Sequence, residues 1–281
     1  MVPTNSTQTH GVKMSERVLL AGPFLGELGW ELFCWQGYVR AKSKDFDRTI
    51  VISRPLNKYL YQDFAEVVEF DPESNLTEAW WCNNAKSPNE LIKKIKEEKG
   101  VTAILFGDFD IGYRCQTDGL HTLSDKFKEQ VFHKYGNLSS SPFSVDVVIH
   151  ARNKQTGDFR NWSKEKWQQL IDRLNEEHDL HIACIGGPDS FHLDNTEDMR
   201  MIQMDKLTSV LHSSNMIVGP SSGPLHLASL CGTKQIVWST EHNRKRYEND
   251  WNPFDSEVRF YSEEGWDPNV ESIFNIISNE L

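Results

Sequence analysis

A run of small polar residues opens a predicted helix in the second half of the chain. It reads Ser221-Ser222-Gly223-Pro224 and stands between two short apolar segments. A helix that begins in such a loop directs unpaired backbone N–H groups and the positive end of its dipole at one place. His226 falls in the first turn, where we expect it to touch a bound anion or a sugar hydroxyl. The pattern predicts a phosphate site, with an ordinary capped helix as the alternative.

Positive charge gathers in the loop after another predicted strand. The strand covers residues 145–150, and the loop carries Arg152, Lys154 and Arg160. Loops at the carboxyl ends of parallel strands form the ligand-binding edge of open α/β folds. Any one of these cations could be a solvated loop charge. Their clustering at this edge predicts that at least one of them binds phosphate.

A third polar loop follows a strand predicted at residues 101–106. It carries Asp108, Asp110 and Arg114, which could bind the hydroxyls or charge of an acceptor molecule. An Asp-x-Asp pair can also hold a metal ion beside a nucleotide sugar. This pair lies far from the phosphate loop in sequence, and we therefore predict no metal site.

These loops need rigid elements to position them, and strands alternate with helices in two blocks. The first block begins with a strand at residues 18–21, a glycine-rich loop that contains Glu27 and Glu31, and a helix. The loop does not have the GxGxxG spacing of dinucleotide-binding proteins. In the second block Ser163 is placed to cap a helix, and Gly232 is placed to end one in a left-handed conformation.

The alternation predicts an α/β fold of two doubly wound parallel-sheet (Rossmann-like) domains that face a central cleft. The small, polar, proline-containing stretch at residues 137–143 is the predicted linker. The expected division of the chain is a disordered extension over 1–16, a first domain over 17–136, a second domain over 144–268, and a terminal helix over 269–281 that could cross back to the first domain.

The phosphate-loop segment resembles a family signature. Ser-Ser-Gly-Pro-Leu-His-Leu-Ala from Ser221, followed by Cys-Gly-Thr from Cys231, is similar to the Asp-Ser-Gly-Pro-x-His-Leu-Ala…Gly-x-Pro signature of the heptosyltransferase-like glycosyltransferases, family 9. Those enzymes have the two-domain GT-B fold. The sequence departs at Ser221, where the family usually has Asp, and at Lys234, where Pro is common. The resemblance covers residues 145–240 well and the first domain chiefly over 17–41.

The resemblance implies a nucleotide-diphosphate sugar as donor. Its diphosphate would lie at the helix that starts near Ser222, and Arg160 is the closest match to a basic residue that contacts donor phosphate. Arg152 or Lys154 would assist it. Gly186 and Gly187 stand where the family has a Gly-Gly pair at which the backbone approaches the donor.

The resemblance also implies a general base in the first loop. The family has Gly-x-Gly-Asp there, with the Asp taken to deprotonate the acceptor hydroxyl. In this chain Glu27 and Glu31 are the nearest carboxylates, and we rank Glu27 slightly ahead because it lies within the loop. Glu31 could instead be a first-turn carboxylate favoured by the helix dipole. The implied reaction is an inverting, metal-independent hexosyl, heptosyl or pentosyl transfer that needs no cofactor beyond the donor.

Composition narrows the class of protein further. The net charge of −11 argues against a general nucleic-acid or anionic-membrane binder. The cysteines are dispersed without a CxxC pair, which predicts reduced thiols in a cytoplasmic protein. The sequence has no apolar run long enough to span a membrane. Residues 1–13 lack the apolar region of a signal peptide.

The acceptor is left open by the sequence. A saccharide or lipid-linked glycan is the acceptor that the resemblance implies. A modified DNA base, as for phage hydroxymethylpyrimidine glycosyltransferases, would need a basic cleft from Arg114, Arg244, Lys245 and Arg246. A non-catalytic nucleotide-sugar-binding protein would keep the phosphate loop and tolerate loss of both glutamates. A GT-B epimerase would need acids around the sugar ring and no acceptor site.

Overall fold

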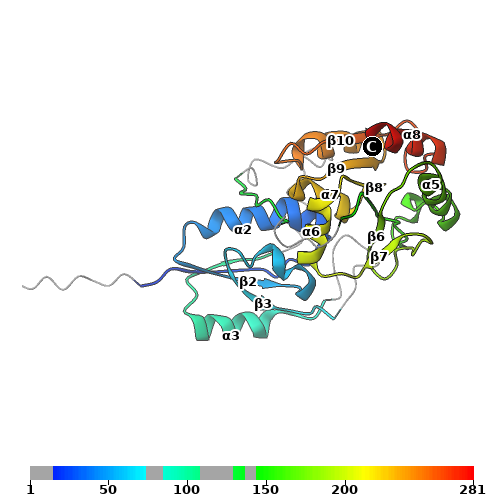
Figure 1. The fold of residues 1–281 in the computed structure, drawn as a ribbon. Helices are drawn as coiled ribbons and strands as arrows, with labels where there is room; N and C mark the ends of the chain where they lie inside the picture. Colours follow the sequence, from blue (N-terminus) through cyan, green and yellow to red (C-terminus); the bar gives the residue numbers. More distant parts are fainter. Residues whose placement is uncertain (1–14, 74–84, 108–128, 137–143) are drawn as a thin grey trace, which may run out of the picture.

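A computed structural model describes residues 15–73, 85–107, 129–136 and 144–281. Within these ranges the chain forms two parallel β-sheets flanked by helices, as the alternation predicted (Figure 1). The acceptor-loop candidates Asp108, Asp110 and Arg114, the linker 137–143 and most of the N-terminal extension lie outside the described residues.

The first domain holds the four-stranded sheet, in the order β3-β2-β1-β4. Its strands are β1 (Val18–Ala21), β2 (Arg48–Ser53), β3 (Glu66–Glu69) and β4 (Ala103–Leu105). Helices α2 (Gln36–Ser43) and α3 (Asn89–Lys99) cover opposite faces, because alternate strand residues pack into two different apolar clusters. A short 3₁₀ helix, η2 (Pro55–Leu60), follows β2.

The second domain holds the six-stranded sheet, in the order β10-β9-β8-β5-β6-β7. Its strands are β5 (Val147–Ile149), β6 (Ile182–Gly186), β7 (Glu197–Arg200), β8 (Met216–Pro220), β9 (Lys234–Trp238) and β10 (Val258–Tyr261). The helices are α5 (Lys164–Glu177), α6 (Met204–Ser213), α7 (Gly223–Cys231) and α8 (Val270–Glu280). Sequence patterning missed β7 and β10 because both are edge strands with mostly polar or part-exposed residues.

The local signals of the second domain are confirmed. The Ser163 hydroxyl accepts a hydrogen bond from the Lys166 N–H at 3.3 Å, which caps α5. The rings of Trp162 and Trp167 lie 4.9 Å apart and staple the same helix end. Gly232 ends α7 with φ of 75°, a conformation that favours glycine.

Residues 129–136 form neither a helix nor a strand. The sequence left open that the terminal helix crosses back to the first domain. Helix α8 instead packs against α5 within the second domain, and its Glu280 pairs with Lys234 at 2.8 Å.

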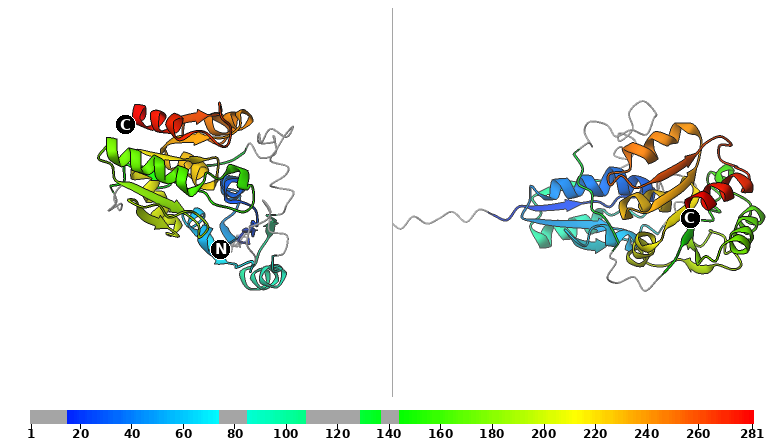
Figure 2. Two further views of the ribbon diagram at one scale, coloured as in Figure 1. Left: turned by 90° about the vertical axis from the view of Figure 1, so that its right-hand side faces the viewer. Right: turned by 45° about the horizontal axis from the view of Figure 1, so that its top comes forward.

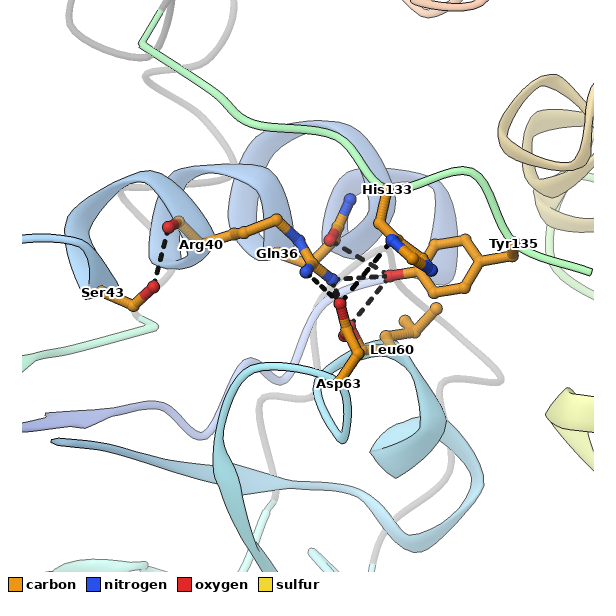
Figure 3. Close-up of polar contacts among 7 residues, drawn as sticks. All are labelled: Gln36, Arg40, Ser43, Leu60, Asp63, His133 and Tyr135. Atoms are coloured by element: carbon orange, nitrogen blue, oxygen red, sulfur yellow. Dashed lines mark hydrogen bonds and ion pairs between the residues drawn. The ribbon is translucent and has the colours of Figure 1, made fainter.

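The segment 129–136 links α2 of the first domain to α7 of the second. The Tyr135 N–H donates to the Leu230 carbonyl at 2.8 Å, and the Tyr135 hydroxyl donates to the Leu60 carbonyl at 2.9 Å. Arg40 donates to both carboxylate oxygens of Asp63 and lies within hydrogen-bond distance of Tyr135, as Figure 3 shows. Burial raises the pKa of Tyr135, so the phenol stays protonated in this network.

The start of the first-domain helix docks on the second domain (Figure 1 and Figure 2). This start consists of α1 (Leu28–Trp30) and the π-helical turn η1 (Glu31–Trp35), which leads into α2. Phe33 stacks on Trp251 with ring centroids 5.1 Å apart, and Trp30 meets the same indole edge-on at 5.0 Å. Residues of both domains therefore share one apolar core.

Replacing Phe33 by alanine should lower the free energy of unfolding by about 3–5 kcal/mol, because it removes a fully buried ring from this shared core. Urea denaturation followed by tryptophan fluorescence measures the loss. Phe159→Ala is the matched control, since that ring is 65% exposed and should cost little. Equal losses in the two variants would contradict the docked arrangement.

Candidate functional site

Glu27 of the first domain faces a group of cations on the second. It immediately precedes the docked α1 as its N-cap residue, with extended backbone angles and a half-buried side chain. Burial lowers the pKa of Arg152, Lys154 and Arg246, and the Glu27 carboxylate partly offsets this in each case, which places it among these three cations. Within the described residues, no side-chain hydrogen bond caps α1 from Glu27. The Glu27 carboxylate is therefore a negatively charged group among cations of the second domain.

Arg152 shapes the loop that follows β5. It is buried, and its guanidinium donates to the carbonyls of Gly157 at 3.0 Å and Thr156 at 2.6 Å, and to the Asn161 side chain. Burial and the nearby Arg160 lower the pKa of Arg152 to about 10, which still leaves it charged at neutral pH. Arg152 therefore stabilises the conformation of the loop and contributes positive electrostatic potential to the site.

Arg160 and Lys154 stand on the same loop with donors still available. The Arg160 guanidinium lies 5.6 Å from the Trp266 ring centre, and its buried Nε has no hydrogen-bond partner in the described part of the chain. A β-carbon at Gly157 would lie 2.8 Å from Arg160 Nη2, so the loop needs glycine there. Partial desolvation, then Arg152 and Arg160, lower the pKa of Lys154, although its side chain keeps contact with water.

The start of α7 is held from two sides. The Ser222 hydroxyl lies 2.8 Å from His150 Nδ1, and the Ser222 N–H donates to the Tyr247 hydroxyl at 3.1 Å. The Tyr247 O–H donates in turn to the buried Ser221 hydroxyl at 2.9 Å. Ser222, Gly223 and Pro224 remain half-buried at the domain boundary, where a β-carbon at Gly223 would lie 3.3 Å from Leu28 Cδ2. The helix start therefore borders the other domain closely.

His150 is a buried neutral imidazole beneath this helix start. Burial, with Lys154 and Arg152 nearby, lowers the pKa of His150 to about 3. The ring therefore couples the loop after β5 to Ser222 without adding charge. Sequence analysis missed this role because His150 ends a buried strand, and only the sheet order brings it to Ser222.

His226 and Glu31 lie in different surroundings from Glu27. His226 is buried, and its ring stacks on Tyr247 of the same domain with centroids 4.4 Å apart. It also meets Phe33 of the first domain edge-on at 6.3 Å, so it packs between the domains. Glu31 is 1% exposed and accepts hydrogen bonds from Arg54 at 2.9 Å, Asn57 at 2.5 Å and Tyr61 at 2.7 Å. Its carboxylate is enclosed by partners of the first domain.

The Gly186-Gly187 pair stands at the carboxyl end of β6. Gly186 has φ of 141°, and a β-carbon there would lie 2.1 Å from Ser190 Oγ and 3.3 Å from His150 Cδ2. Gly187 is exposed and has open space around it. The first glycine is required by packing, and the second leaves room for a ligand.

Across the described ranges, no group of His, Cys, Asp and Glu side chains is arranged to hold a metal ion. None of the helices in the described part of the chain has the length and apolar character needed to cross a membrane.

Comparison with solved structures identifies the fold, whereas comparison of sequences does not. No family model and no curated protein matches the sequence. A glycosyl transferase family 9 structure from Veillonella parvula matches with a TM-score of 0.61 at 10% identity, over 94% of this chain and 97% of that one. E. coli ADP-heptose lps heptosyltransferase II gives 0.60 at 10% identity, over 94% and 98%. E. coli heptosyltransferase WaaC with ADP gives 0.59 at 12% identity, over 94% and 100%.

The chain has the GT-B fold of these heptosyltransferases. The prediction of two Rossmann-like domains is thereby confirmed. The likeness extends over nearly the whole length of both partners, so the two domains match together and not as separate halves. At this low identity the match establishes the GT-B architecture, and the site's chemistry has to be argued from its own residues.

The stability of the protein should depend on pH through His150. The unfolded imidazole has a pKa of about 6.5, above the folded value of about 3, so the unfolded state binds the proton first. The stabilisation is complete above pH 6.5 and declines as the pH falls toward 3. Between pH 7 and pH 5 the loss should be about 2 kcal/mol.

Urea titrations of the wild type and His150→Asn at both pH values measure this contribution. The variant should show a smaller decline in the free energy of unfolding. His242→Asn controls for loss of an exposed imidazole. An unchanged decline in His150→Asn would show that His150 is not the group responsible.

Proposed function

We propose that this protein is a glycosyltransferase that moves a sugar from a nucleotide-diphosphate sugar to an acceptor hydroxyl. The observation that carries the proposal is the placement of Glu27 on one domain against Arg152 and Lys154 on the other, both of which also neighbour Arg160. The GT-B fold, shared with heptosyltransferases that include one with ADP, supports it. We also propose that the protein acts in the cytoplasm.

The second domain would hold the donor. The buried Nε of Arg160 has no hydrogen-bond partner in the described ranges, and Arg152 and Lys154 add charge at the same loop. The positive end of the α7 dipole at Ser222 and Gly223 lies at the domain boundary. When the glycosidic bond breaks, negative charge builds on the leaving diphosphate, and fixed positive groups stabilise that transition state.

The first domain would supply the base. Glu27 would remove the proton from the acceptor hydroxyl as that oxygen attacks the sugar carbon. Glu31 would support it indirectly, because Arg54 joins the Glu31 carboxylate at 2.9 Å to the Gly26 carbonyl at 2.8 Å. Gly26 directly precedes Glu27. The buried glutamate thus fixes the loop on which the proposed base stands.

Direct attack by the acceptor on the donor sugar would invert the configuration at the reacting carbon. The cations and the helix dipole could neutralise the leaving group, so the proposal includes no metal ion and no cofactor beyond the donor. A glycan or another molecule with a free hydroxyl would be the acceptor.

A DNA acceptor is less well supported by the loop after β9. Arg244 is paired with Glu241 at 2.7 Å and with Glu248 at 3.0 Å, and Lys245 lies 3.5 Å from Asp250. These carboxylates offset the positive charge that a basic cleft would need. We therefore retain the glycan or small hydroxyl acceptor as the proposal.

Glu27→Gln should lower kcat for sugar transfer by about 10²- to 10⁴-fold and leave donor affinity nearly unchanged, because the amide cannot accept the proton. Transfer from a panel of UDP-, GDP-, ADP- and CMP-sugars, with donor binding measured by calorimetry, tests this. Full transfer activity in Glu27→Gln would refute the assignment of the base.

Glu31→Gln is the matched comparison, because it makes the same chemical change four residues along the chain. It should lower the melting temperature, since it leaves Arg54 without its buried counter-charge. Normal stability with abolished transfer in Glu31→Gln would move the base to that residue. Normal donor binding with no transfer by the wild type on any acceptor would favour a non-catalytic nucleotide-sugar-binding protein.

A further inference from the structure

Arg246 lies at the junction of the two domains, and two of its N–H donors have no hydrogen-bond partner among the described residues. It begins the π-helical turn η7 (Arg246–Asp250) of the second domain. Its guanidinium lies 4.7 Å from the ring centre of Trp251 and 5.8 Å from that of Trp30, which belongs to the first domain. Its Nε and Nη2 are buried and have no hydrogen-bond partner within the described residues. No ion pair of Arg246 is found there either.

This arrangement is costly for the protein alone. A buried guanidinium loses hydration, and each unsatisfied donor adds to the loss. Burial, with a smaller contribution from the neighbouring Arg160, lowers the pKa of Arg246 to about 10, although Tyr247, Cys34 and Glu27 partly offset this. At neutral pH the group is nevertheless charged. Stacking on two indoles holds it in place and leaves its edge donors for another partner.

The neighbours of Arg246 indicate what that partner is. Arg160, which we propose as a donor-phosphate ligand, and Glu27, which we propose as the base, both act on its charge. The group between them in the proposed reaction is the phosphate that leaves the sugar. Two oxygens of a phosphate can accept two parallel N–H bonds from one guanidinium.

We propose that Arg246 binds the donor's diphosphate, with its Nε and Nη2 as the donors, and so completes the phosphate site from the junction of the domains. This inference rests on the proposed function and names a phosphate ligand that lies outside the loop after β5 and the start of α7. The Trp30–Trp251 pair positions it, so that the first domain contributes to donor binding through an indole face.

Inorganic pyrophosphate is the probe, because it needs no knowledge of the nucleotide. Calorimetry and thermal melts with and without pyrophosphate would compare the wild type with Arg246→Met, Arg246→Lys and Arg160→Met. Lys245→Met is the matched control, since it removes the same charge from the adjacent, exposed side chain. Methionine retains packing on the indoles but has no charge or donors.

The wild type and Lys245→Met should bind pyrophosphate alike, and Arg246→Met should bind it at least about tenfold more weakly. Arg246→Lys should also bind weakly, because an ammonium cannot reproduce the flat, two-donor edge. Without pyrophosphate, Arg246→Met should melt at or above the wild-type temperature, since an unsatisfied buried charge is gone.

Two results would overturn the proposal in distinguishable ways. If Arg160→Met weakens pyrophosphate binding while Arg246→Met leaves it unchanged, Arg246 is not a phosphate ligand and the proposed function stands. If the wild type binds neither pyrophosphate nor any nucleoside diphosphate, the proposed function fails together with this inference.

Discussion

The docking of α1 on α7 and Trp251 is the contact on which the site depends. It is close because Gly29 has no side chain, and a β-carbon there would lie 3.1 Å from His226 and 3.3 Å from Trp251. Glu27 immediately precedes this docked helix. The packing that joins the domains therefore also positions the Glu27 carboxylate relative to the cations of the second domain. A shift of α1 on α7 would displace Glu27 from these cations.

The charge at this junction is arranged at the expense of stability. Arg152 and Arg246 are both desolvated, with pKa values lowered to about 10, and Arg160 repels each of them. Glu27 offsets only part of this positive charge. This cluster of cations stands out in a protein whose net charge is −11. A diphosphate would relieve the repulsion, so donor binding and domain docking would reinforce each other.

Sequence patterning predicted those features that depend on neighbours along the chain. The buried central strands, the capped start of α5 and the left-handed end at Gly232 follow from local spacing, and all are observed. The exposed edge strands β7 and β10 lack that spacing. In the sequence, Arg246 was only one cation of a basic loop. What distinguishes it is its contact with Trp30, which lies more than two hundred residues earlier in the chain.

Glu27 and Glu31 show most directly why the site could not be assigned from the sequence. Both are glutamates in the same loop-to-helix segment, and both suit a helix start. Glu31 is enclosed by three side chains from the segment that follows β2, namely Arg54, Asn57 and Tyr61. Cations from the other domain surround Glu27 instead. The Glu31 carboxylate is therefore held by three fixed donors of its own domain, whereas Glu27 faces the other domain. Long-range packing, and not residue type, gives the two glutamates different surroundings.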